Sequence, residues 1–314
     1  MFTFILTNER ENILFGRRHD GRRVRHLDPI IEATPYVMPM RCDAMVYLSH
    51  DLDYEPMMRY IAQKARDEKI KITFLQLLIA AYVRAISQVP EINRFIINKQ
   101  YFNRTELTCA LVVLMDTEDG SIKENTIKVR FDPSDTIYDV QARVNKKVEE
   151  NRKNEMPGGA IRIARFVLKV PGLTSCIVWL LRFLDRYGIM PGVLIDELPF
   201  HVGLWLTNNA SIGLKSVYHH IYNFGNTSMF FGLGTPNRGY TINAKGEPVR
   251  YARIPVGITV DERVCAGATF AKMFTIMNQC LKNPELLEIP PEKVYYNEGA
   301  EYHEPKPELE AKVV

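Results

Sequence analysis

A polar turn near the carboxyl end of the sequence carries the side chains best suited to chemistry. Residues 261–267 read DERVCAG, which places two carboxylates, a guanidinium and a thiol within five positions. The preceding residues alternate in hydrophobicity as a half-buried β-strand does, and the apolar residues Phe270, Phe274, Met277 and Leu281 then recur at helical spacing. A turn from a strand into a helix fixes a side chain rigidly at a sheet edge, so we expect chemistry here.

The remaining sequence excludes several kinds of site. Cys265 is a candidate nucleophile, but no histidine is adjacent to it, and its position favours a buried small side chain. The sequence holds no Gly-rich phosphate loop, no metal-ligand spacing and no Ser/His/Asp signature. We therefore expect no metal centre.

Two further blocks of sequence belong with the turn. Residues 71–96, KITFLQLLIAAYVRAISQVPEINRFI, predict a core helix that Thr73 caps and Pro90 stops. Residues 201–234 predict two apolar strands joined by a loop that holds Ser211, Gly213, His219, His220 and Asn223. With DERVCAG and the later KNPELL, these blocks resemble, in order, the catalytic domain of the acyltransferase component of 2-oxo acid dehydrogenase complexes, a relative of chloramphenicol acetyltransferase.

The resemblance extends from about residue 28 to residue 287 and implies a fold, an assembly and a reaction. The fold is an α/β two-layer sandwich of the chloramphenicol-acetyltransferase type, a mixed sheet with helices packed on one side. The assembly is a homotrimer, or a larger assembly of trimers, with each site between subunits. The reaction is acyl transfer between thiols, or from a thioester to a hydroxyl or amine, with a coenzyme A (CoA) thioester as co-substrate.

Two chemical positions depart from the family pattern. Glu262 stands where the family has its histidine base, and Ala266 stands where it has an aspartate, whereas Thr207 lies at the position of the hydroxyl that steadies the oxyanion. A free glutamate has a pKa of about 4.3 and a thiol about 8.5, so an ordinary carboxylate is a weak base towards a thiol. Burial that raises the pKa of Glu262 towards neutrality would close part of that gap.

Three interpretations follow from this departure. In the first, Glu262 is the base, as the resemblance to stand-alone relatives without lipoyl domains implies. In the second, His219 or His220 supplies the base from the loop. In the third, catalysis is lost and the chain is an inactive trimeric scaffold or assembly protein.

A short basic run and an unusual apolar region remain. Residues 17–25, RRHDGRRVR, predict either a solvated surface loop or an arm whose Arg17, Arg18, Arg22 and Arg23 bind the phosphates of CoA or contact another subunit. Residues 158–192 mix apolar side chains with Arg162, Arg165, Lys169, Arg182 and Arg186. They predict a helical insertion packed on the fold or on another subunit, or an interfacial element that touches membrane lipid or an apolar substrate.

The totals agree with this outline. The 314 residues suffice for one large domain at residues 28–287, between an N-terminal arm (1–27) and a C-terminal tail (288–314) that is poorly ordered or follows the surface. The net charge of +3 gives no case for nucleic acid, and five scattered cysteines suggest no disulfide framework. No targeting leader opens the sequence, which predicts a cytoplasmic protein.

Overall fold

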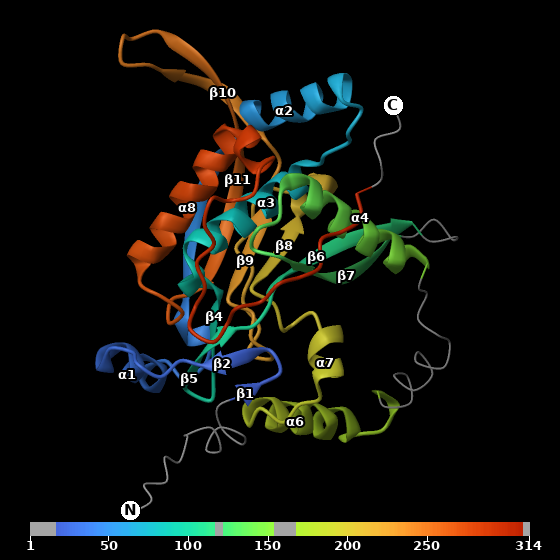
Figure 1. Ribbon diagram of the computed structural model, residues 1–314, viewed down its shortest axis with the longest axis vertical. Helices are drawn as coiled ribbons and strands as arrows, with labels where there is room; N and C mark the ends of the chain where they lie inside the picture. The colour runs from blue at the N-terminus through green and yellow to red at the C-terminus, as the bar shows by residue number, and fades with distance from the viewer. Residues whose placement is uncertain (1–16, 117–121, 154–167, 310–314) are drawn as a thin grey trace, which may run out of the picture.

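The computed structural model describes residues 17–116, 122–153 and 168–309 (Figure 1). Its helices are α1 (Pro29–Val37), α2 (Tyr54–Asp67), α3 (Phe74–Gln88), α4 (Ile137–Lys153), α6 (Leu173–Arg186), α7 (Gly192–Glu197) and α8 (Gly267–Lys282). Its strands are β1 (Arg17–Arg18), β2 (Gly21–Arg23), β3 (Met45–Asp53), β4 (Arg94–Ile97), β5 (Gln100–Arg104), β6 (Leu107–Asp116), β7 (Ile122–Phe131), β8 (Leu204–Asn208), β9 (Met229–Leu233), β10 (Asn237–Ile242) and β11 (Pro248–Asp261).

A seven-stranded mixed sheet forms the centre of the molecule. Its order is β10-β11-β9-β8-β6-β7, and β3 pairs with the carboxyl half of β11. Strand β8 runs parallel to both β6 and β9, while the other pairs are antiparallel. Helices α2, α3, α4 and α8 lie over one face of this sheet (Figure 1). The expected fold class, a mixed sheet with helices packed on one side, is confirmed.

The alternation in β11 decides which side chains meet the helices. Ile254, Val256, Ile258 and Val260 are all buried in the main core, together with the inner faces of α3 and α8. Helix α3 begins where the sequence predicts, because the Thr73 hydroxyl accepts from the backbone N–H of Gln76 and the Gln76 side chain accepts from that of Thr73. It ends at Gln88, two residues before Pro90.

Over β9 and β11, the opposite face of the sheet is covered by a loop instead of helices. Residues 214–224 run over β9 and β11, and a Cβ on Gly257 or Gly232 would lie only 2.3 or 2.5 Å from the carbonyl oxygen of Val217. Glycine at these two positions therefore lets the loop backbone rest directly on the strands. Beside it, Trp205 and Phe230 form a small second core with Tyr222 packed against it.

The basic run near the start of the described chain is not a solvated loop. Strands β1 and β2 join β5 and β4 in a second, antiparallel sheet of four strands. Arg18 is buried there, and its guanidinium pairs with Asp20 and with Asp185 of α6. The alternative of a solvated loop overlooked this pairing, because Asp185 is far away in sequence.

The regions outside the main sheet show two further arrangements. In the described part of the expected insertion, α6 lies at one end of the molecule, apart from the large sheet (Figure 1); residues 158–167 fall outside the described residues. Residues 288–309 follow the surface and are anchored, since Asn93 donates to the hydroxyl of Tyr302 at 3.1 Å and Lys306 pairs with Asp135. Within the described residues, no helix combines the length and apolarity that crossing a membrane demands.

Candidate functional site

The turn after β11 is held by a buried ionic cluster. Both carboxylate oxygens of Asp261 accept from the Arg263 guanidinium, at 2.8 and 2.7 Å, and Arg41 Nε lies 3.6 Å from the same carboxylate. All three side chains are buried. Burial alone lowers the pKa of Arg263, but the hydrogen bond and charge of Asp261 raise it above its usual value. Arg263 therefore stays charged, and its two hydrogen bonds to Asp261 fix the backbone on both sides of residue 262.

Glu262 projects outward from this fixed turn. Its backbone N–H donates to the carbonyl oxygen of Ala44 at 3.0 Å, while its side chain is exposed. Ala266, at the position where the resembled family has an aspartate, is also exposed and is the N-cap residue of α8. The described chain therefore does not supply the burial that would raise the basicity of this carboxylate.

Thr207 lies at the other end of the sheet. It pairs with Gly232 of β9, which pairs in turn with Gly257 of β11, whereas Glu262 lies five positions beyond Gly257. At about 3.3 Å per residue, the two catalytic candidates are separated by roughly 16 Å along the strands. One chain does not bring them together.

Asn209 is a functional candidate that sequence reasoning missed. The Thr207 hydroxyl donates to Asn209 Oδ1 at 3.4 Å, which is a long hydrogen bond. The Asn209 amide nitrogen is buried and has no hydrogen-bond partner among the described residues. An unsatisfied buried donor is rare in native proteins. The Thr207 hydroxyl and the Asn209 amide are thus neighbours, and the one hydroxyl hydrogen would have to turn away from Asn209 Oδ1 to serve, with this N–H, as a donor to an oxyanion. The only sequence signal is the pair of asparagines after Thr207.

The two loop histidines lie on the face of the sheet that bears Thr207. The His219 ring stacks on Phe230 with centroids 4.1 Å apart, and His220 stacks on His219. His219 Nδ1 lies 2.9 Å from the carbonyl oxygen of His220. Because a carbonyl only accepts, Nδ1 carries the hydrogen and Nε2 of the neutral ring holds the lone pair that takes a proton.

The basic arm is divided between structure and surface. Arg18 is fully engaged with Asp20 and Asp185, and Arg22 donates to the backbone oxygens of Arg18 and Gly21. Arg23 is exposed, and Arg17 lies in β1. Phosphate binding by this arm stays a prediction, with Arg22 and Arg23 as its better candidates.

The thiol in the turn is poorly suited to attack. Cys265 is half-buried, and burial raises the pKa of its thiol to about 12 despite the nearby positive charge of Arg94. Because the thiolate is the nucleophile, a thiol that stays protonated at neutral pH does not initiate chemistry.

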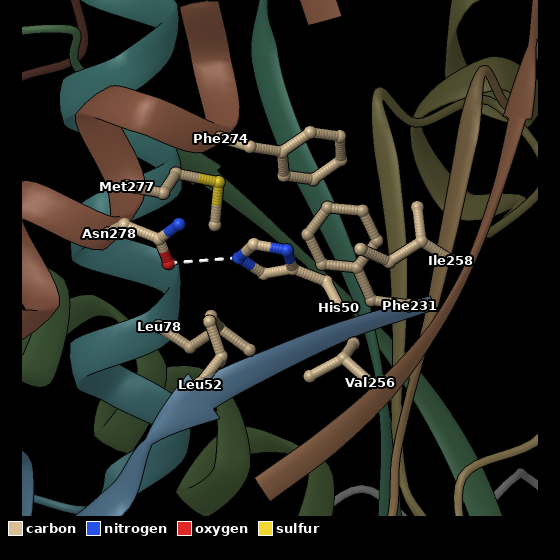
Figure 2. A pocket seen from close by; sticks show the side chains of 9 residues that line it. All are labelled: His50, Leu52, Leu78, Phe231, Val256, Ile258, Phe274, Met277 and Asn278. Carbon is tan, nitrogen blue, oxygen red and sulfur yellow. Dashed lines mark hydrogen bonds between the residues drawn. The ribbon is translucent and has the colours of Figure 1, made fainter. Parts of the chain in front are cut away.

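An apolar pocket lies on the helix side of the sheet, away from Thr207. Figure 2 shows its lining: His50, Leu52, Leu78, Phe231, Val256, Ile258, Phe274, Met277 and Asn278. His50 Nε2 lies 2.9 Å from Asn278 Oδ1, and the ring stacks on Phe274. Only one imidazole and one amide are polar here, and none of the candidate bases Glu262, His219 and His220 lines the pocket, so we assign it no catalytic role.

One group of side chains resembles a metal site in composition. Ligand atoms of His19, Glu106 and Asp196 all lie within 4.8 Å of one another. Arg130 already bridges the two carboxylates, with Nε 3.0 Å from Glu106 and Nη2 2.6 Å from Asp196. A guanidinium in that place repels a cation, so the group is an ion-pair cluster of the second sheet and its neighbours.

Comparisons with known proteins give similar structures at low sequence identity. No family model and no curated protein sequence matches the chain. The cubic core of the pyruvate dehydrogenase multienzyme complex is similar over 91% of this chain and 99% of its own, at 13% identity and a TM-score of 0.47. A probable dihydrolipoamide acetyltransferase from Listeria monocytogenes is similar over 87% of this chain and 98% of its own, at 10% sequence identity and a TM-score of 0.48. A chloramphenicol acetyltransferase is similar over 83% of this chain and 100% of its own, at 10% sequence identity and a TM-score of 0.45. These are the two groups that the sequence motifs resemble.

Proposed function

We propose that the chain is an acyltransferase that uses a CoA thioester at a site formed between two copies. The observation that carries the proposal is the turn after β11. The buried Asp261–Arg263 pair holds this turn rigid while Glu262 projects from it, although Thr207 and Asn209 lie at the opposite end of the sheet. A heterologous contact that closes into a ring sets one end of a chain against a different end of its neighbour. A homotrimer built this way supplies three equivalent sites.

At such a site the residues at the two ends of the sheet have different chemical roles. Glu262 of one copy accepts the proton of the attacking thiol, hydroxyl or amine, and the freed electron pair attacks the thioester carbonyl carbon. Thr207 Oγ1 of the neighbour, whose hydrogen turns from Asn209 Oδ1, donates to the oxyanion of the tetrahedral intermediate together with Asn209 Nδ2. Its collapse breaks the carbon–sulfur bond and releases the CoA thiolate, which recovers the proton from Glu262.

Contact with the neighbour gives Glu262 the environment that a base needs. A carboxylate covered by apolar surface holds a proton more readily than one in water. In this proposal Arg22 and Arg23 meet the phosphates of the nucleotide, since guanidinium groups bind phosphates through paired donors.

Ligand binding and turnover provide the test. Millimolar acetyl-CoA should raise the thermal midpoint of the protein, because a ligand that binds only the folded state stabilises it. Release of free CoA to a small thiol acceptor should fall about 100-fold or more in Glu262→Gln and in Thr207→Val. An exposed control, Glu247→Gln on the β10–β11 hairpin, should leave turnover unchanged. No stabilisation by acetyl-CoA counts against the proposal, and unchanged turnover in Glu262→Gln removes this residue from the mechanism.

His219 is a second candidate for the base, which the ring geometry supports. Its Nε2 carries the free lone pair, and the ring lies on the sheet face of Thr207 within one chain. Loss of turnover in His219→Gln, with normal turnover in Glu262→Gln, would transfer the role to His219.

An inactive assembly protein is the alternative of a different class. The methyl group of Ala266 and the exposure of Glu262 favour it, because a methyl group cannot orient a base and the single chain leaves the Glu262 side chain open to solvent. A trimer that binds no CoA thioester and turns none over would establish this alternative.

A further inference from the structure

Helix α6 presents an aromatic and basic surface that the acyl-transfer proposal does not use. Trp179, Leu180, Phe183 and Tyr187 are all exposed, and we call them the α6 outer face. The aromatic rings contact one another in sequence, since the centroids of Trp179 and Phe183 lie 5.7 Å apart and those of Phe183 and Tyr187 4.8 Å apart. So much contiguous exposed apolar surface marks a place of interaction.

The helix is fixed to the protein by its other side. The buried Asp185 carboxylate pairs with Arg18 at 2.6 Å and lies 3.2 Å from His201 Nε2. At 3.6 residues per turn, Asp185 points away from Phe183 and Tyr187. The half-buried apolar side chains of the helix are those of Leu173, Ile177, Leu181 and Leu184. The outer face is therefore held in place by contacts that leave it open.

The exposed charges on α6 and on the described residues just before it are positive. From Leu168 to Leu184 the described chain contains Lys169 and Arg182, both exposed, and no acidic residue. Arg186 is exposed and donates to Asn98, which brings the neighbouring Lys99 of the β4–β5 turn close to the end of the helix. The one acidic residue of α6, Asp185, is buried and paired.

We infer that the α6 outer face docks on an anionic phospholipid membrane surface. Amphipathic helices that lie in the membrane interface combine aromatic and leucine side chains on one face with Lys and Arg beside them. At 14 residues, α6 has a length of about 21 Å, which suits lying in the plane of the interface rather than crossing it. Trp and Tyr prefer the level of the headgroups, where the basic side chains meet lipid phosphates.

The charge pattern favours lipid over a second copy of the chain. A two-fold contact would set this face of one copy against the same face of the other, so the exposed charges on both sides, Arg182 and Arg186, would all be positive, and like charges gathered in one interface are unfavourable. An anionic membrane instead complements every exposed charge on the helix.

Tryptophan fluorescence and vesicle sedimentation test this inference on the full chain. The protein has two tryptophans, of which Trp179 is 64% exposed and Trp205 is 6% exposed. Vesicles of phosphatidylcholine with about a third phosphatidylglycerol should shift the emission to the blue, and Trp179→Phe should abolish that shift. Binding should fall at least about tenfold in Trp179→Ser/Phe183→Ser and should weaken as salt rises. The control Tyr240→Ser, which removes an exposed aromatic side chain from β10, should bind normally.

Three results would overturn the inference. The first is the absence of binding to the anionic vesicles. The second is equal binding to these vesicles and to neutral vesicles of phosphatidylcholine alone. The third is a blue shift that grows with protein concentration in the absence of lipid. The last result, with a larger sedimenting species that Trp179→Ser abolishes, would assign the outer face to a second copy. None of these readouts involves acyl transfer, so the inference stands or falls independently of the proposed function.

Discussion

Removal of the Asp261 charge should destabilise the protein far more than removal of an exposed carboxylate. In Asp261→Asn the shape of the side chain is kept, but the buried guanidinium groups of Arg263 and Arg41 lose the anion that both of them face. Breaking a buried ion pair on one side costs about 3–5 kcal/mol. The remaining amide oxygen still accepts one hydrogen bond, so we expect a loss of about 3 kcal/mol, the lower end of that range.

Urea unfolding measures this loss directly. With a slope of about 3 kcal/mol per molar urea, the midpoint should fall by about 1 M. The matched control is Asp53→Asn, because Asp53 ends β3 with a side chain 42% exposed and forms long ion pairs to Arg253 and Lys282. We expect it to change stability by less than about 0.5 kcal/mol. Equal, small effects of the two variants would refute the claim that the buried cluster holds the turn.

Three further outcomes follow from the packing and charges. Gly257→Ala should cost about 1–3 kcal/mol because its Cβ meets the loop backbone, whereas Gly267→Ala, with open space around it, should be neutral or slightly stabilising by urea unfolding. A thiol reagent at pH 8 should modify Cys42 and Cys176 rapidly and the other three cysteines slowly, as counted by absorbance before and after unfolding. Burial alone raises the pKa of Asp185, but His201 and Arg18 bring it below its usual value. The Asp185 carboxylate should therefore stabilise the fold fully above about pH 4, and this stabilisation should be lost as the pH falls through the folded-state pKa. Between pH 5 and pH 3 the free energy of unfolding should consequently fall more in the wild type than in Asp185→Asn.

The fold follows from local patterns in the sequence to a large extent. The alternation in β11, the capping box of Thr73 and the stop at Pro90 each act within a few residues, so their signals are readable directly. The contacts that complete the site have no such signal. Arg41 meets Asp261 across 220 positions of sequence, and Arg18 meets Asp185 across 167. Long-range pairs of this kind arise only once the sheets and helices have brought distant segments together.

The separation of Glu262 from Thr207 is likewise a property of the sheet. The motifs place both residues at strand ends, but only the antiparallel register of β9 and β11 shows that these ends are opposite. The proposed function therefore places the site between two copies, where both residues can act.

Complementation between two inactive variants tests this arrangement most directly. Glu262→Gln and Thr207→Val are each expected to lack turnover as pure proteins. When equal amounts are unfolded, mixed and reassembled, about a quarter of the sites in a randomly mixed ring should combine an intact Glu262 with a neighbour's intact Thr207. The account predicts that about a quarter of wild-type CoA release returns. A mixture that stays as inactive as its components would contradict it.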